Sequence, residues 1–222
     1  MTSEPTGFLY PFIDAEERDS SSLVADLAAS ARAKIGESRA IRAATLDRCD
    51  SALAETGRAM ADRFQRGGRL FAFGNGGSAT DAEGTVELFR NPPHGRPLAA
   101  MSLVDDRAVL TALANDVGFE LVFSRQLIAH AKEGDIAVGF STSGGSVNVL
   151  GAFVEAARRT LLTVGLCGYE GGAMAQSDVV DHCLVVRSDS VHRIQEAQDA
   201  LILRLWSIVQ QCLEEDSESG RP

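Results

Sequence analysis

Two short segments rich in Gly, Ser and Asn contain the residue types best suited to holding a ligand. Residues 75–78 (Asn-Gly-Gly-Ser) follow the apolar run 70–73, and residues 141–146 (Ser-Thr-Ser-Gly-Gly-Ser) follow the apolar run 136–140. Gly lets the backbone turn tightly with its N–H groups exposed, and a helix start adds unpaired N–H donors. Ser and Thr hydroxyls add donors without charge. The segments predict a phosphate site; the alternative is two ordinary strand-to-helix turns capped by Ser.

The charge pattern limits which ligands this site can serve. Neither segment contains Lys, so the Gly-x4-Gly-Lys-Ser/Thr nucleotide loop is absent, and the Gly-x-Gly-x-x-Gly dinucleotide pattern is absent too. The formal charge of the whole chain is −10, which argues against a broad basic face for nucleic acid. A small anionic ligand needs only local donors, so it remains compatible with an acidic chain.

Length and composition favour one α/β domain with a full core over the alternative of two small domains. The chain has 222 residues, of which 45% are hydrophobic. Its four cysteines form no C-x-x-C pair, so buried free thiols are expected. No apolar run is long enough to span a membrane, and the first residues lack the basic start of a signal peptide. We therefore expect a cytoplasmic protein with no membrane partner.

The order of apolar runs predicts an α/β fold. Strands are expected at residues 70–73, 98–103, 136–140, 162–166 and 182–186. Helical patterns lie at residues 80–89, 107–115, 120–132, 147–158, 172–176 and 191–215. Unbroken apolar strands that alternate with helices predict a three-layer, doubly wound, five-stranded parallel sheet. Both Gly/Ser segments then fall at the carboxyl ends of strands, where such sheets bind ligands.

The N-terminal part is expected to add two helices to this core. A helix is expected over residues 16–34, because Leu23, Leu27, Ala31 and Ile35 recur at four-residue spacing. Ser38 is a candidate N-cap for a second helix that ends before the Gly pair 67–68. The expected organisation is an N-terminal arm (1–14), a single domain (15–213) and an acidic, flexible tail (214–222).

Six motifs in order resemble the sugar isomerase (SIS) family, specifically its phosphoheptose isomerase branch. They lie at residues 73–78, 115–116, 123–126, 134–135, 141–144 and 193–196. The resemblance covers about residues 38–212 and implies the SIS fold, with a homotetramer whose active sites lie between subunits. It also implies a phosphorylated sugar as ligand, with D-sedoheptulose 7-phosphate isomerised to an aldoheptose phosphate.

The resemblance also assigns roles to individual residues. The residues that it implies for phosphate binding are Ser141, Thr142, Ser143 and Ser146. Those implied for the sugar are Asn75, Gly76, Ser78, Asp106 and Gln195. Asp106 has an equal alternative reading, because a residue directly before the helix at 107–115 can simply cap it.

The chain departs from the family where many members hold zinc and carry the catalytic pair. The family pattern has His and Glu four residues apart after the first Gly segment, and a second His eight residues beyond the Gln. Gly84, Leu88 and Leu203 occupy these three positions here, and only Gln195 is retained. None of the three can coordinate a metal or move a proton, so we expect neither zinc nor another cofactor.

Other residues offer a rearranged acid and base. Shifting the alignment by one residue places Glu83 and Glu87 four apart on one helix face, although two solvated surface carboxylates are the alternative. His192 precedes the last motif and is either a base or an ordinary helix-start residue. Glu87 with His192 is the catalytic pair that we predict if the protein is active.

Three functions follow from these residues. The first is a sugar-phosphate-binding protein that resembles phosphoheptose isomerase and catalyses aldose–ketose isomerisation with altered residues. The second is a non-catalytic SIS module that senses a sugar phosphate or acts as an assembly or regulatory partner of another protein. The third is a structural tetramer with an empty phosphate loop, which the four hydroxyl residues at 141–146 disfavour.

Overall fold

The computed structural model describes residues 20–219, with side chains described from residue 23 to residue 215. The arm expected at residues 1–14 lies outside this range, as do residues 220–222. Internal contacts divide the described chain into two units, residues 20–40 and residues 41–219.

One parallel sheet forms the centre of the second unit, with strand order β2-β1-β3-β4-β5. The strands are β1 (Leu70–Gly74), β2 (Ala100–Ser102), β3 (Ile136–Ser141), β4 (Leu162–Gly168) and β5 (His182–Val186). Every residue of β1, β3 and β4 is buried, which explains why these strands read as unbroken apolar runs. The predicted five-stranded parallel sheet is confirmed.

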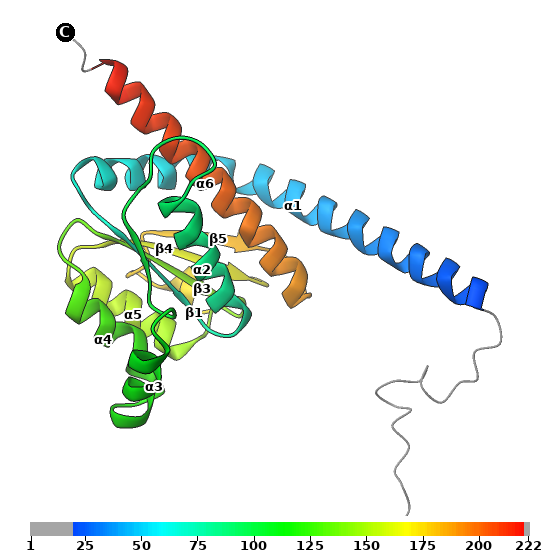
Figure 1. Cartoon of the computed structure of the whole chain (residues 1–222), viewed down its shortest axis with the longest axis horizontal. Coiled ribbons are helices and arrows are strands. Elements are labelled where there is room, and N and C mark those ends of the chain that lie inside the picture. The colour runs from blue at the N-terminus through cyan, green and yellow to red at the C-terminus, as the bar shows by residue number, and fades with distance from the viewer. Residues whose placement is uncertain (1–19, 220–222) are drawn as a thin grey trace, which may run out of the picture. The chain divides into compact units, whose positions relative to one another are not determined.

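Helices cover both faces of this sheet, as Figure 1 shows. One face is covered by α2 (Gly77–Arg90), α6 (Val191–Ser219) and residues 41–65 of α1 (Ser20–Gln65). The other is covered by α3 (Arg107–Asp116), α4 (Val122–His130) and α5 (Val147–Arg158). Side chains alternate between these layers along β1, because Leu70 and Ala72 join the first core and Phe71 and Phe73 the second. The three-layer arrangement is the one predicted.

The two expected N-terminal helices are a single helix, which corrects that detail of the prediction. α1 runs without a break from Ser20 to Gln65 and includes both Gly36 and Ser38. A Gly inside a helix costs only about 1 kcal/mol, and no Pro interrupts this stretch. In the first unit Leu23, Leu27 and Ile35 are exposed, whereas residues such as Leu53 in the second unit are buried.

Smaller elements differ from expectation mainly at their ends. β2 has only three residues, because this edge strand pairs with β1 only from Ala100 to Ser102. The helix expected at 120–132 is a 3-10 turn, η2 (Phe119–Leu121), followed by α4, and the one expected at 172–176 is the turn η3 (Met174–Gln176). α6 continues to Ser219, into the expected tail. Within residues 20–219, no helix is both long and apolar enough to cross a bilayer.

Candidate functional site

Three serine hydroxyls converge between β3 and α5, in residues 141–146, here called the serine loop. Ser141 ends β3 and is only 3% exposed. Its Oγ lies 2.9 Å from the Oγ of Ser146 and 3.4 Å from the Oγ of Ser143. Ser146 stands at the start of α5, but its side chain does not cap that helix. The first-turn N–H groups of α5 therefore remain available to an anion beside the three hydroxyls.

Close backbone packing fixes the shape of the serine loop. Gly144 has φ +64°, and a Cβ there would lie 2.0 Å from the carbonyl oxygen of Gly171. The carbonyl of Thr142 accepts a hydrogen bond of 2.9 Å from the N–H of Gly168, and the carbonyl of Gly144 accepts one of 2.8 Å from Met174. The end of β4 and the segment after it thus pack against the serine loop, and only Gly fits at position 144.

The glycine loop, residues 75–78, is joined to the serine loop by a pair of amides. Asn75 donates to Asn148 Oδ1 at 2.8 Å, and Asn148 donates to Asn75 Oδ1 at 2.9 Å. Gly76 has φ +59° and lies exposed at the start of α2, while Ser78 is buried in its first turn. Asn75, predicted to bind the sugar, here links the two loops. Asn148 was missed, and only its position in the first turn of α5 hinted at a role.

Gln195 reaches from α6 to the other end of the glycine loop, together with an unpredicted carboxyl. Its Nε2 donates to Asp81 Oδ2 at 3.2 Å. A Cβ on Gly77 would lie 2.2 Å from the same nitrogen, so the glycine permits this approach. Burial raises the pKa of Asp81 from 3.8 to about 6; the Gln195 hydrogen bond opposes this rise and the charge of Asp199 adds to it. Asp81 therefore keeps its proton to a higher pH than an ordinary aspartate does.

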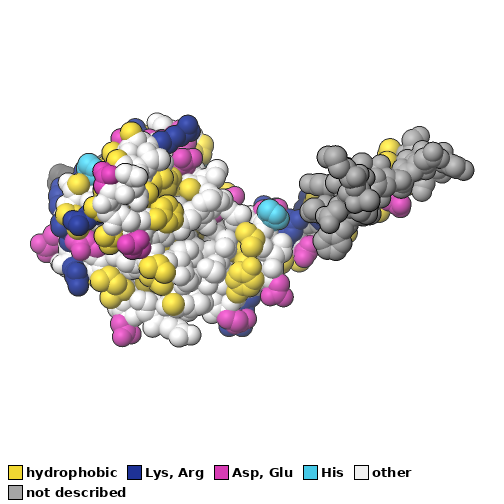
Figure 2. All heavy atoms as spheres, turned by 90° about the horizontal axis from the view of Figure 1, so that it is seen from below, with side chains coloured by type: hydrophobic (Ala, Val, Ile, Leu, Met, Phe, Trp, Pro, Cys, Tyr) yellow, Lys and Arg dark blue, Asp and Glu magenta, His cyan; other side chains and the backbone are white. Residues whose placement is uncertain are grey.

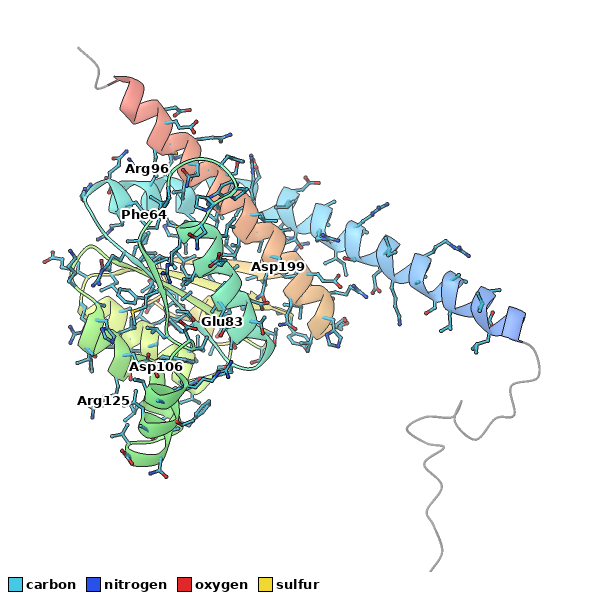
Figure 3. All side chains as sticks on the ribbon, in the orientation of Figure 1. Phe64, Glu83, Arg96, Asp106, Arg125 and Asp199 are labelled. Atoms are coloured by element: carbon cyan, nitrogen blue, oxygen red, sulfur yellow. The ribbon has the colours of Figure 1, made fainter. Side chains whose placement is uncertain are left out.

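A hollow of about 750 Å³ gathers the remaining predicted carboxylates beside α2. Glu83 and Glu87 line it from α2, and Asp106 lines it from the start of α3; Figure 3 shows Glu83 and Asp106 on these neighbouring elements. Asp106 caps α3 by accepting from Val109 N at 3.0 Å, as its alternative reading predicted. A carboxylate has two oxygens, so this cap is compatible with binding a hydroxyl. Arg90 and Arg107 line the same hollow.

The residues that the resemblance places at the family's zinc positions do not fit a metal. A Cβ on Gly84 would meet no atom within 4 Å, Leu88 packs against the core, and Leu203 is 53% exposed. Only Gln195 offers a donor atom, and within residues 23–215 no three His, Cys, Asp or Glu side chains gather as a metal site. His192 lies exposed at the start of α6, whereas Glu87 is on α2 and accepts from Asn91 at 3.0 Å.

Comparison with known proteins identifies the family and the fold of this chain. A family model described as the SIS domain matches residues 35–168, and the chain belongs to this family. Its relatives include a phosphoheptose isomerase of Campylobacter jejuni, 42% identical over 159 residues that cover 71% of this chain and 84% of that protein. The SIS resemblance expected from the motifs is thus confirmed.

Solved structures of phosphoheptose isomerases have the same fold as this chain. The phosphoheptose isomerase of Neisseria gonorrhoeae superposes with a TM-score of 0.77 and 32% identity, over 83% of this chain and 99% of that one. The phosphoheptose isomerase of Francisella tularensis superposes with a TM-score of 0.77 and 30% identity, over 82% and 97%. The similarity extends over nearly the whole length of both enzymes.

The raised pKa of Asp81 gives a testable pH dependence. Since folding favours its protonated form, the ionised carboxyl costs stability, and this cost grows from about pH 4 to pH 6 and then stays constant. Asp81→Asn removes the cost but can still accept from Gln195. We expect the free energy of unfolding of the variant to rise by about 1 kcal/mol relative to wild type between pH 4 and pH 7. The gain is this small because the carboxyl is only partly buried. Urea unfolding at each pH measures the free energy of unfolding of both proteins. A difference between them that stays constant from pH 4 to pH 7 would contradict the prediction.

Proposed function

We propose that this protein binds a phosphorylated sugar, with the phosphate in the serine loop. The observation that carries this proposal is the convergence of the hydroxyls of Ser141, Ser143 and Ser146 at the N-terminus of α5. Hydroxyl and backbone N–H donors at a helix start suit a dianion without requiring a Lys or Arg. The names of the relatives, phosphoheptose isomerases, support the same ligand class.

The sheet gives the direction in which the sugar extends. β1 lies between β3 and β2, so the glycine loop separates the serine loop from the hollow. Neighbouring strands are about 4.8 Å apart, which places the ends of β3 and β2 about 10 Å apart. A sugar phosphate is of comparable length. We infer that the sugar passes Asn75 and Ser78 and directs its hydroxyls toward Asp106.

The reaction that we propose is aldose–ketose isomerisation of D-sedoheptulose 7-phosphate, as the names of the relatives suggest. This reaction needs a base that moves a proton between adjacent carbons and an acid that opens the sugar ring. Glu87 in the hollow and His192 on α6 are the predicted pair, and Asp81, whose pKa is raised to about 6, is a third candidate. No step is assigned to zinc, because three of the four family positions lack a ligand atom.

A second function, binding without chemistry, is favoured by one specific observation. Gly84 faces open space and Leu203 is exposed at positions where the family carries its catalytic and metal groups. A protein that retains the serine loop but lacks these groups would sense a sugar phosphate or regulate a protein partner. We propose no direct binding of nucleic acid, because acidic, basic and apolar side chains are interspersed on the face that Figure 2 shows.

We propose a homotetramer in the cytoplasm as the working form. The exposed apolar side chains of Leu23, Leu27 and Ile35 on α1 form a stripe that a second copy would cover. Four free cysteines are compatible with a reducing compartment. Light scattering should give four times the 23.6 kDa mass of one chain, and the mass of a single chain would contradict the assembly.

Adding a negative charge to the serine loop should abolish binding. Ser143 is exposed, so Ser143→Glu places a carboxylate among the anion donors without disturbing the core. We expect calorimetry with sedoheptulose 7-phosphate to show at least a hundredfold loss of affinity, since like charge replaces a donor. Ser51→Glu adds the same charge to an exposed position on α1 and should bind like wild type. Equal affinity in both variants would contradict the phosphate assignment.

Deuterium exchange separates catalysis from binding alone. Sedoheptulose 7-phosphate is incubated with the protein in deuterated buffer and followed by proton NMR. If the protein is an isomerase, the carbon next to the carbonyl should take up deuterium and new anomeric signals should appear, both more slowly with Glu87→Gln. Ligand line broadening without deuterium uptake would contradict the isomerase and support the sensor.

A further inference from the structure

Within residues 20–219, two residues other than Gly have a positive φ: Thr160 at 62° and Tyr169 at 50°. Thr160 is explained by the end of α5. Its N–H donates to Ala157 at 3.0 Å, and the N–H of Leu161 donates to Ala156 at 3.1 Å. A left-handed residue at this position is a common way to end a helix. The backbone of Thr160 therefore needs no functional explanation.

Tyr169 occupies a position at which the backbone favours Gly. It follows β4 in a turn closed by a 2.9 Å hydrogen bond from Gly171 N to the carbonyl of Gly168. A positive φ at the first central residue of a β-turn is usually supplied by Gly, and it is strained for a bulky side chain. Gly is used at positions 168, 171 and 172 of this segment, but not at 169. The tyrosine is 36% exposed, so part of its side chain remains accessible to a ligand.

This turn lies directly against the serine loop. Cys167, two residues before Tyr169, pairs with Ser141 across the sheet. Gly168 N donates to the carbonyl of Thr142 at 2.9 Å. A Cβ on Gly172 would lie 2.3 Å from the carbonyl oxygen of Ser143. The backbone of this turn is thus held at the edge of the serine loop, and residues with a strained backbone cluster at ligand sites.

We propose that Tyr169 contacts the phosphate-bearing end of the sugar phosphate held by the serine loop and helps to determine which sugar is accepted. The rest of the sugar extends from β3 toward β1 and β2, away from this turn. A tyrosine offers the apolar face of its ring to the carbon–hydrogen face of a sugar and a hydroxyl to its oxygens. The inference rests on the proposed function, because it assumes a sugar phosphate in the serine loop. Tyr169 here is a specificity-determining contact and takes no part in proton transfer.

Two glycine variants separate a ligand contact from a purely structural residue. Tyr169→Gly relieves the backbone but removes the ring, and Thr160→Gly relieves the same kind of backbone strain at the opposite end of β4. Both should leave the melting temperature unchanged or raise it by up to about 2–4 °C. Only Tyr169→Gly should weaken binding of sedoheptulose 7-phosphate in calorimetry, by about three- to tenfold. Its affinity for inorganic phosphate should change less, since the ring contacts the sugar.

The outcomes distinguish this inference from the proposed function. If wild type binds sedoheptulose 7-phosphate and Tyr169→Gly binds it equally well, the inference is overturned and the phosphate assignment stands. If both glycine variants weaken binding equally, the effect is not specific to the site and the inference is also overturned. If wild type binds neither sedoheptulose 7-phosphate nor phosphate, the proposed function fails and the inference fails with it.

Discussion

The parallel pairing of β1 with β3 is the interaction on which the site depends. Their register aligns Gly74 with Phe140, so the glycine loop and the serine loop leave the sheet side by side. The reciprocal amide bonds between Asn75 and Asn148 then hold the two loops together. Because the strands are buried on both faces, their carboxyl ends cannot shift without disturbing both cores. A rigid scaffold of this kind can hold neutral donors in place for an anion.

Neutral donors also reconcile an acidic chain with an anionic ligand. The formal charge of −10 disfavours an anion at long range, but hydroxyls and helix N–H groups act over hydrogen-bond distances. Close backbone packing makes this possible, since Gly144 lies against Gly171 and Gly77 against Gln195. Side chains at either glycine would separate the segments. The glycines therefore matter more for packing than for flexibility.

Much of the fold was predictable because it depends on local signals. The central strands are continuous apolar runs, and the two Gly/Ser loops follow them directly, so both were located from the sequence. The single helix α1 was not predicted, since Gly36 and Ser38 resemble a boundary although a helix tolerates both. Ser38 was interpreted as the start of a second helix because Ser is a preferred N-cap residue, but the same residue lies inside the continuous helix.

The positions of the two loops of the candidate site were predictable from the sequence, but their contacts were not. Asn148 and Asp81 were missed because their roles arise from residues far away in the sequence, Asn75 and Gln195. Glu87 and Asp106 were selected separately, and only the structure shows that they line the same hollow. Such juxtapositions depend on how helices pack against the sheet, which no local pattern in one sequence specifies.

The position of the phosphate in a complex tests the central claim most directly. A crystal structure with bound sedoheptulose 7-phosphate should place phosphate oxygens within about 3 Å of the hydroxyls of Ser141, Ser143 and Ser146 and of the first N–H groups of α5. A phosphate bound instead by Arg90 or Arg107 in the hollow would contradict the claim. It would show that the serine loop is a structural turn and that ligand recognition depends on charged side chains.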